Sequence, residues 1–385
     1  MRISKLPHCG LYDLNDFNDF NGSNVLNCLN DLTNKMKETA PSKKTCNLMQ
    51  QGYRPGSCLV ATGNRRQLAC EATLRLQEGE LQRLITSMHL SRPENYFSIY
   101  QSGCNLSCRK CHSWYFSKEA TGEWLSPDDI LLNVKNYEEQ VTLMEPRERS
   151  TAWHAHESCH CCGSCILTGE RSPRCPGVLG ARDITISPQG FGPARNIVGF
   201  TGGDLTCCPD FYAQCAQLIK DNTNLWVLIE TNGYGLTPEN LDMLRESGTD
   251  CFWLDIKAED ADRHRWLTGC DNQWILQLPE EMLKRNFVVE VLSLYIPGVV
   301  EAEELGRIAN RLAAVDPNIP FTILAFFPQY KMKDFETPTV EDIVRAYENA
   351  KAAGLSSIRL GNLGVFANGV EDYRYLEAHV DSDAY

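Results

Sequence analysis

The sequence predicts an α/β fold in which about six βα units surround a parallel sheet and form an open, partial barrel. From Tyr96 onward, short apolar runs alternate with amphipathic stretches, which is the pattern of strands that alternate with helices. Several helix starts between these runs carry a capping residue followed by proline or acidic residues. A chain of 385 residues can hold such a domain together with further segments.

The apolar runs are the candidate strands of this sheet. They cover residues 97–100, 197–200, 225–229, 251–254, 288–292 and 321–325, and 357–360 is a candidate for a seventh. Sheets of this kind bind their ligands at the carboxyl ends of the strands. Functional residues are therefore expected directly after these runs.

Three helix starts are well marked. Ser126 precedes Pro127 and two aspartates, Thr237 precedes Pro238 and a glutamate, and Thr339 precedes an acidic first turn. Such residues cap the free N–H groups of a first turn, so we expect helices to begin there. A further helical pattern covers residues 71–88.

The segments outside this alternation define the expected organisation. Residues 1–95 form an N-terminal extension with scattered cysteines, and 96–366 form the partial barrel. Residues 145–195 are rich in Cys, His, Gly and Pro and form an insertion between the first and second βα units. Residues 367–385 form an acidic tail that we expect to be solvated.

Composition narrows the class of protein. A net charge of −13 argues against a nucleic-acid partner, whose phosphates need a basic face. No apolar run has membrane-spanning length and no signal-peptide pattern is present, so we expect a cytoplasmic protein. Eighteen cysteines that cluster in a reducing compartment indicate metal rather than disulfides. Because thiolates and clusters are oxidation-prone, an anaerobic setting is expected.

The most informative cysteines follow the first strand. Cys104, Cys108 and Cys111 are spaced C-x3-C-x2-C, and three such thiolates can hold three irons of a [4Fe–4S] cube. The fourth iron then has no protein ligand, and an open metal position is where chemistry can occur. A zinc site is the alternative, and Cys108, Cys111 and His112 also match the attachment pattern of c-type haem.

Four further motifs follow later strands in a fixed order. They are Thr201-Gly202-Gly203-Asp204, Glu230-Thr231-Asn232-Gly233, Trp253-Leu254-Asp255-Ile256-Lys257 and Tyr295-Ile296-Pro297-Gly298. Together with the three cysteines, this series resembles the radical SAM superfamily, and within it the pyruvate formate-lyase-activating enzyme. The resemblance covers about 270 residues, roughly 96–366.

The resemblance implies an enzyme with two cofactors, a [4Fe–4S] cluster and S-adenosylmethionine (SAM). Reductive cleavage of SAM gives a 5′-deoxyadenosyl radical that abstracts hydrogen from a substrate. Gly202, Gly203 and Asp204 are expected at the methionyl amine. Glu230, Asn232, Asp255 and Lys257 are expected around SAM or the substrate. The implied partners are a reductant, such as flavodoxin or ferredoxin, and a protein substrate on which the enzyme installs a glycyl radical.

Some positions depart from that pattern. Position 110 is Lys where the family often has an aromatic residue near the adenine, and 291–294 lacks the family's arginine. Residues 326–332 and the segments around Cys46 and Cys58 resemble the AmmeMemoRadiSam group instead. These departures favour, as alternatives, modification of another peptide or a small molecule. A non-catalytic iron–sulfur or zinc protein is the third interpretation.

The insertion carries a second cysteine series. Cys159, Cys162 and Cys165 are followed after nine residues by Cys175 and Pro176, which resembles an enlarged ferredoxin run. Four thiolates predict a second cluster for electron transfer, and zinc or mononuclear iron is the alternative. Other cysteines are less informative. Cys207 and Cys208 fit either an active-site role or ordinary packing, and the wide spacing of Cys46, Cys58 and Cys70 favours packing.

Overall fold

The computed structural model describes residues 46–385, so Cys9 and Cys28 lie outside the described residues. In this part of the chain, ten strands form one sheet in the order β14-β13-β12-β11-β10-β9-β5-β4-β3, with β6 paired to β4. The strands are β3 (Leu74–Gln77), β4 (Glu80–Leu90), β5 (Phe97–Gln101), β6 (Glu123–Leu125), β9 (Ile197–Gly202), β10 (Trp226–Thr231), β11 (Cys251–Asp255), β12 (Val288–Tyr295), β13 (Phe321–Ala325) and β14 (Ile358–Gly361).

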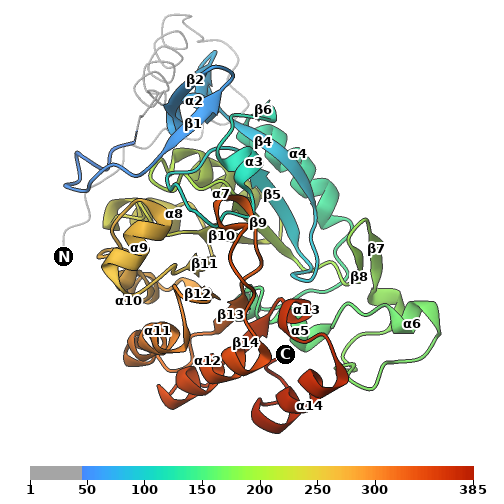
Figure 1. The fold of residues 1–385 in the computed structure, drawn as a ribbon. Helices are drawn as coiled ribbons and strands as arrows, with labels where there is room; N and C mark the ends of the chain where they lie inside the picture. Colours follow the sequence, from blue (N-terminus) through green and yellow to red (C-terminus); the bar gives the residue numbers. More distant parts are fainter. Residues whose placement is uncertain (1–45) are drawn as a thin grey trace, which may run out of the picture. The chain divides into compact units, whose positions relative to one another are not determined.

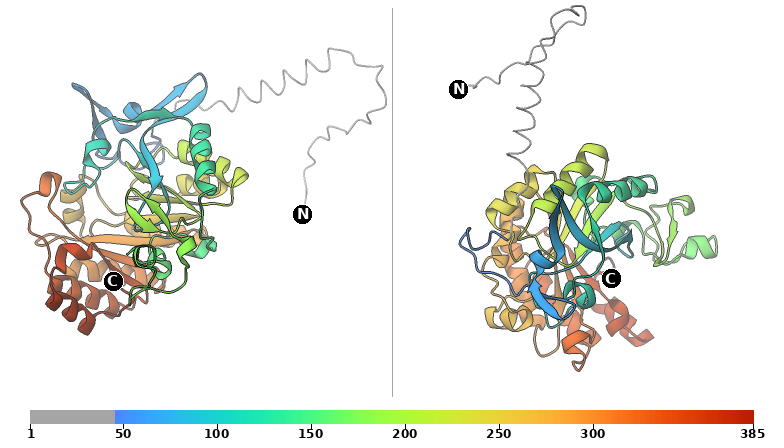
Figure 2. Two further views of the ribbon diagram at one scale, coloured as in Figure 1. Left: turned by 90° about the vertical axis from the view of Figure 1, so that its right-hand side faces the viewer. Right: turned by 90° about the horizontal axis from the view of Figure 1, so that it is seen from above.

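Every neighbouring pair from β5 to β14 is parallel, and all seven predicted strands are present. The spatial order of these strands is their order in the sequence. Because parallel crossovers are right-handed, successive crossovers in one direction put all connecting helices on the same side. The strands therefore lie inside and the helices form an outer layer, which confirms the α/β partial barrel (Figures 1 and 2).

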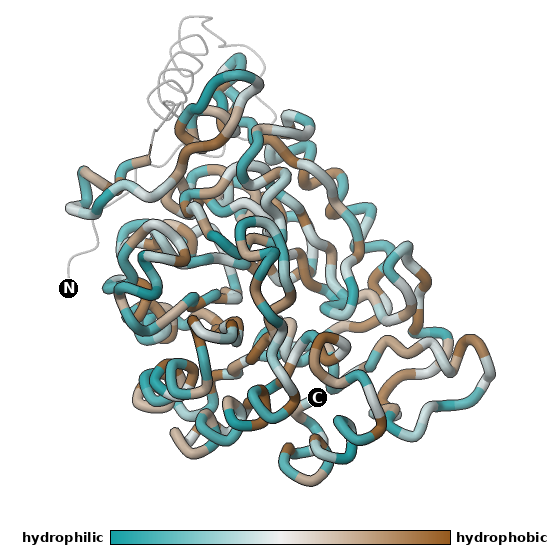
Figure 3. Tube along the Cα trace, viewed as in Figure 1, coloured by the Kyte–Doolittle hydropathy of each residue, from teal (hydrophilic) through white to brown (hydrophobic). Residues whose placement is uncertain are grey.

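The outer helices begin where the capping residues predict. Ser126 and Thr339 each form a capping box at the start of α4 and α12, and the Thr237 hydroxyl accepts from Asn240 N at 3.3 Å at the start of α8. Hydrophobic and hydrophilic residues alternate along α11 and α12, whose buried faces pack on the sheet (Figure 3). These helices are α4 (Pro127–Glu138), α7 (Asp210–Asn222), α8 (Pro238–Glu246), α9 (Ala261–Thr268), α10 (Leu278–Lys284), α11 (Ala302–Val315) and α12 (Val340–Ala352).

The predicted helix over 71–88 is wrong. Helix α2 (Ala69–Thr73) ends at once, and β3 and β4 follow as an antiparallel hairpin that extends the large sheet. Glu78 and Gly79 form its turn with φ of 55° and 87°. Positive φ at both central residues matches the twist of a two-residue hairpin, so the turn overrides the helical spacing of the apolar residues. A second hairpin, β1 (Leu59–Thr62) and β2 (Arg65–Leu68), precedes it.

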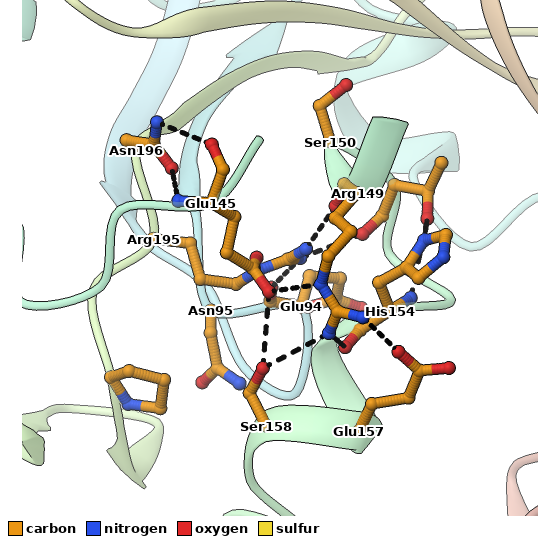
Figure 4. A network of polar contacts seen from close by, with 12 residues as sticks. Glu94, Asn95, Glu145, Arg149, Ser150, His154, Glu157, Ser158, Arg195 and Asn196 are labelled. Atoms are coloured by element: carbon orange, nitrogen blue, oxygen red, sulfur yellow. Dashed lines mark hydrogen bonds and ion pairs between the residues drawn. The ribbon is translucent and has the colours of Figure 1, made fainter. Parts of the chain in front are cut away.

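A buried ion-pair network anchors the insertion to the start of β9 (Figure 4). The Arg195 side chain is fully buried and donates to Glu145, whose carboxylate also accepts from Arg149 at 3.0 Å. Arg195 donates to the backbone oxygens of Glu94 at 3.1 Å and Thr151 at 2.8 Å as well. Each polar atom of this pair is thus compensated, as burial of charge requires.

The insertion itself contains short elements, and α6 lies at its periphery (Figure 1). They are η1 (Arg147–Arg149), α5 (Ala155–Ser158), α6 (Ser164–Leu167), η2 (Ala181–Asp183), β7 (Thr185–Ser187) and β8 (Gly190–Gly192). The remaining elements are α3 (Trp114–Ser117), η3 (Ile275–Gln277), η4 (Tyr330–Met332), α13 (Leu363–Phe366) and α14 (Val370–His379).

The C-terminal residues are packed rather than fully solvated. Leu376 of α14 is completely buried, and Ala384 and Tyr385 are almost so. Leu360 N of β14 donates to Ala384 O at 2.7 Å, which joins the end of the chain to the last strand. Within residues 46–385, no helix has both the length and the apolar character needed to cross a membrane.

Candidate functional site

A cavity of about 780 Å³ lies at the carboxyl ends of the parallel strands. Every strand from β5 to β14 contributes to its wall at or just after its last residue. The lining includes nine of the ten residues expected at the cluster and at SAM: Cys104, Cys108, Cys111, Gly202, Asp204, Glu230, Asn232, Asp255 and Lys257. The tenth, Gly203, lies between two of them in the sequence.

The three cysteines lie on the loop that leaves β5. Burial raises the pKa of the Cys104 thiol, and it raises the pKa of Cys108 to about 12. Lys257 and Lys118 act on Cys108 in the opposite direction, so two cations stand near the sulfurs. Burial beside cations suits thiolates that a metal deprotonates, because the cations offset the charge that the ligands bring.

The glycines of the second motif allow β5 and β9 to approach closely. Gly203 N donates to Gln101 O at 2.8 Å, and Asn105 N donates to Asp204 O at 2.9 Å. A Cβ at Gly203 would lie 2.2 Å from Gly103 O, so any side chain would force the strands apart. Gly202 has a φ of 87°, which glycine adopts without strain.

Asp204 organises the turn that follows β10. Its Oδ2 accepts from the Thr231 hydroxyl and from Asn232 N, both at 2.8 Å, and its Oδ1 accepts from Thr206 N at 2.8 Å. Both carboxylate oxygens thus already have protein partners. The geometry gives Asp204 a positioning role between the glycine loop and the third motif.

Glu230 and Asn232 face the cavity from the end of β10. The Glu230 carboxylate accepts from the Tyr96 hydroxyl at 2.7 Å and from the Thr201 hydroxyl, and burial raises its pKa to about 7. Asn232 Nδ2 donates to Asn105 Oδ1 at 2.8 Å and lies 3.7 Å from Cys104 Sγ. Asn232 therefore ties the third motif to the cysteine loop.

Asp255 and Lys257 form an ion pair after β11. Burial alone lowers the pKa of Lys257, but the Asp255 carboxylate and the Cys108 sulfur outweigh it, so the net shift is upward. Asp255 Oδ1 and Trp253 Nε1 are buried without a hydrogen-bond partner among the described residues. An unpaired buried polar atom costs free energy, and both of these side chains line the cavity, so a polar ligand bound there could satisfy them.

Residues after β13 complete the wall near the cysteines. Lys110 Nζ lies 3.4 Å from the centre of the Phe327 ring and donates to Gln329 Oε1 at 3.0 Å. The His112 ring meets Phe327 edge-on, with 5.8 Å between the ring centres. Position 110 is Lys instead of the aromatic residue that the resemblance leads one to expect, and the ring of Phe327 provides an aromatic surface next to it. Burial lowers the pKa of Lys110 to about 8.

Sequence reasoning assigned no role to several other lining residues. Three of them carry polar groups at or near strand ends, and this position could have suggested that they line the site: Thr201, Trp253 and Asn362. Leu292, Leu294 and Leu324 form an apolar part of the wall and carry no signal that separates them from core residues.

The four cysteines of the predicted second site lie in the insertion. Cys159 Sγ accepts from Cys161 N at 3.3 Å, and the exposed Cys162 has its sulfur 3.5 Å from the Ser172 hydroxyl. Among residues 46–385, one group of three or more metal-ligating side chains has all its ligand atoms within 4.8 Å of one another, and it consists of Cys46, Cys207 and Cys208. A [4Fe–4S] cluster holds its cysteine sulfurs farther apart than a single metal ion does. A limit of 4.8 Å between ligand atoms therefore does not test either of the two predicted clusters.

Comparison with known proteins identifies one superfamily. Residues 190–312 match the model of the radical SAM superfamily. A protein of Methanocaldococcus jannaschii, named provisionally as a glycyl-radical enzyme activating enzyme, is 31% identical over 39% of this chain and 57% of its own length. The 4-hydroxyphenylacetate decarboxylase activating enzyme of Clostridium scatologenes is 24% identical over 49% of this chain and 64% of its own length. The chain thus spans less than two thirds of these curated relatives.

Two solved structures illustrate the remaining similarity. A domain of the pyruvate-formate lyase-activating enzyme from Bacteroides vulgatus is 20% identical, with a TM-score of 0.37, over 43% of this chain and 98% of that one. SuiB of Streptococcus suis is 12% identical, with a TM-score of 0.41, over 71% of this chain and 50% of that one. Residues 190–312 are therefore the part of the chain that matches a radical SAM domain, and this match and the curated relatives together support an enzyme.

Proposed function

We propose that Cys104, Cys108 and Cys111 bind a [4Fe–4S] cluster whose open iron takes SAM. The observation that carries this proposal is the single cavity that contains the three cysteines and six further residues expected at SAM. When bound and reduced, the cluster supplies the electron that cleaves SAM to methionine and a 5′-deoxyadenosyl radical, which abstracts hydrogen from the substrate.

The chain's own residues would bind and orient SAM and shield the radical from water. Gly202 and Gly203 leave the backbone of β9 open to a ligand, because neither carries a Cβ. Asp255 Oδ1 and Trp253 Nε1 offer an acceptor and a donor to SAM. The leucines of β12 and β13 exclude water from the part of the cavity where a radical forms.

The substrate that we propose is a protein that receives a glycyl radical. Two relatives whose names describe activating enzymes support it, although each is matched over only part of its length. We further propose that flavodoxin or ferredoxin supplies the electron in an anaerobic cytoplasm. Cys159, Cys162, Cys165 and Cys175 would hold a second cluster, or a metal ion, as a relay or a structural centre.

The apolar wall favours a second candidate function. Leu292 and Leu294 occupy the strand end where activating enzymes carry an arginine, so the cavity offers no cation there. An apolar wall suits a different peptide side chain or an apolar small molecule. In that case the chain modifies such a substrate instead of a glycine.

The experiment that tests the cluster is anaerobic reconstitution with iron and sulfide, followed by SAM and dithionite. We expect about four irons at this site and formation of 5′-deoxyadenosine, measured by mass spectrometry. Cys108→Ala should abolish the product, whereas Cys165→Ala should leave SAM binding unchanged. Iron uptake without 5′-deoxyadenosine would reduce the protein to a non-catalytic iron–sulfur protein, and turnover in Cys108→Ala would refute the assigned ligands.

A separate test addresses the substrate. The reconstituted enzyme is incubated with SAM, reductant and a glycyl-radical-type protein encoded next to its gene, and electron paramagnetic resonance follows the radical. A glycine-centred signal that requires Cys108 supports activation of a protein. SAM cleavage that is stimulated by a small molecule or a short peptide, with no glycyl signal, favours the second candidate.

A further inference from the structure

Five cysteines from distant parts of the sequence converge beside the cavity, outside the set that the proposed function uses. The sulfurs of Cys46, Cys207 and Cys208 all lie within 4.8 Å of one another. Cys70 lies next to Cys208, and the fifth cysteine, Cys58, lies near Cys46 and Cys70. None of them forms a disulfide.

The sulfur spacing fits a single metal ion. Tetrahedral zinc has Zn–S bonds of about 2.3 Å, which places the four sulfurs about 3.8 Å apart. The sulfurs of Cys46, Cys207 and Cys208 all lie within 4.8 Å of one another and need only a small contraction to reach this geometry, whereas Cys70, outside that group, would have to move closer to become the fourth ligand. A [4Fe–4S] cube separates its thiolates by the intervening irons and sulfides, so the observed group is too compact for one.

The polypeptide around the sulfurs is well fixed. Cys207 and Cys208 are only 4% exposed and directly precede Pro209 and helix α7. Cys70 is 8% exposed and lies on α2, and Ala69 N donates to Cys58 O at 2.7 Å. Gly235 has its Cα so close to Cys207 that a Cβ would lie 2.4 Å from the Cys207 Cβ. Cys46 is half-buried, whereas the other three proposed ligands are buried, so little ordering of those three remains for metal binding to bring about.

The charge of the thiolates also has compensation. Cys207 and Cys208 lie just before the first turn of α7, a helix of 13 residues whose dipole presents partial positive charge at that end. A divalent ion adds two further positive charges. Soft sulfur ligands in tetrahedral array select zinc, or mononuclear iron, over hard cations.

We propose that Cys46, Cys70, Cys207 and Cys208 form a mononuclear tetrahedral metal site that takes Zn²⁺. This site is separate from both predicted clusters. It joins the segment around Cys46 to the loop between Gly203 and α7. Because Asp204 of that loop accepts hydrogen bonds from the Thr231 hydroxyl and from Asn232 N at the end of β10, the ion braces one wall of the cavity.

The test is metal analysis of the full chain purified without added iron. Elemental analysis should find one zinc that survives replacement of Cys104, Cys108 and Cys111 together. Cys207→Ser and Cys46→Ser should each lower the zinc content by about one equivalent. Cys215→Ala is the matched control, because Cys215 is fully buried on α7 yet outside the group, and it should retain the ion.

A spectroscopic readout keeps the proposal falsifiable where a serine variant fails to fold. Co²⁺ added to the zinc-depleted wild-type chain should give the intense ligand-field bands of tetrahedral cobalt thiolate, and these should be lost in Cys207→Ser. Three results would overturn the proposal: no zinc above the Cys207→Ser level, cobalt bands unchanged in that variant, or a Cys46–Cys207 or Cys46–Cys208 disulfide in the native protein. None of these outcomes depends on SAM cleavage, so the proposed function can stand or fall separately.

Discussion

Replacement of Gly203 by Ala should damage the site through the backbone alone. The added Cβ would lie 2.2 Å from Gly103 O and 2.7 Å from Gln101 O, and ordinary contact begins at 3.4 Å. Both contacts are to backbone atoms, so no side chain can rotate away. Gly203 does not have a positive φ, which means that Ala is compatible with its own backbone conformation. The effect is therefore steric.

The magnitude follows from these contacts. Relief of the clash requires the ends of β5 and β9 to separate by about 1 Å, and overpacking of this kind costs about 1–3 kcal/mol. The separation also weakens two backbone hydrogen bonds, from Gly203 N and Asn105 N, at about 1 kcal/mol each. We expect Gly203→Ala to lose about 3–5 kcal/mol of unfolding free energy. Cys104 moves with Asn105, so iron binding should fall as well.

The assay combines denaturant unfolding of the apo chain with iron content and 5′-deoxyadenosine yield after reconstitution. Gly364→Ala is the matched control, because nothing lies within 4 Å of a Cβ at that position in α13. It should be neutral or stabilising by up to about 1 kcal/mol. If Gly203→Ala unfolds like the wild type and retains iron and turnover, the close approach of these strands does not hold the cysteine loop.

Three further predictions concern other parts of the molecule. Asp255→Asn should weaken SAM binding about tenfold, measured by equilibrium dialysis with the iron content unchanged, because the orphaned acceptor loses its charge. Arg195→Met leaves Glu145 without its buried cation and should cost about 3–5 kcal/mol in denaturant unfolding, whereas Glu157→Gln, at the exposed end of the network, should cost under about 1 kcal/mol. Burial raises the folded-state pKa of Glu290 from 4.5 to about 7, so the contribution of the protonated carboxyl group to the unfolding free energy is full below pH 4.5 and is lost as the pH rises to 7. Glu290→Gln, which does not titrate, should abolish this pH-dependent loss of about 3 kcal/mol. A pH profile of stability that is the same in Glu290→Gln and the wild type would contradict the prediction.

The sequence was sufficient for the parallel strands and for the residues gathered at their ends. Each strand is a short apolar run, and each motif follows such a run directly. The strand order in space equals the order in sequence, so motifs that succeed one another along the chain also become neighbours around one cavity. Local patterning and chain order together carry that information, because right-handed crossovers leave one arrangement.

Other features depend on contacts that the sequence does not encode locally. The helical spacing of apolar residues over 71–88 was outweighed by the two-residue turn at Glu78 and Gly79 and by pairing of β4 with β5. Phe327 lies beside Lys110 although 217 residues separate them in the chain, and its place could be suspected only from the resemblance of 326–332 to another group. The partner networks of Asp204 and Asp255 likewise required coordinates.

The cysteines show the same division most clearly. Cys104, Cys108 and Cys111 lie within one loop, so their spacing alone indicates a shared cluster. The wide spacing of Cys46, Cys58 and Cys70 made packing the better interpretation, and Cys207 and Cys208 fitted either an active-site role or ordinary packing. The sulfurs of Cys46, Cys207 and Cys208 come together, with Cys70 next to Cys208, through tertiary packing that has no local signature in the sequence. In the proposed site, the bound zinc stabilises the loop that contains Asp204. Removal of the zinc should therefore make this part of the cavity wall less ordered, even though none of the proposed zinc ligands lines the cavity.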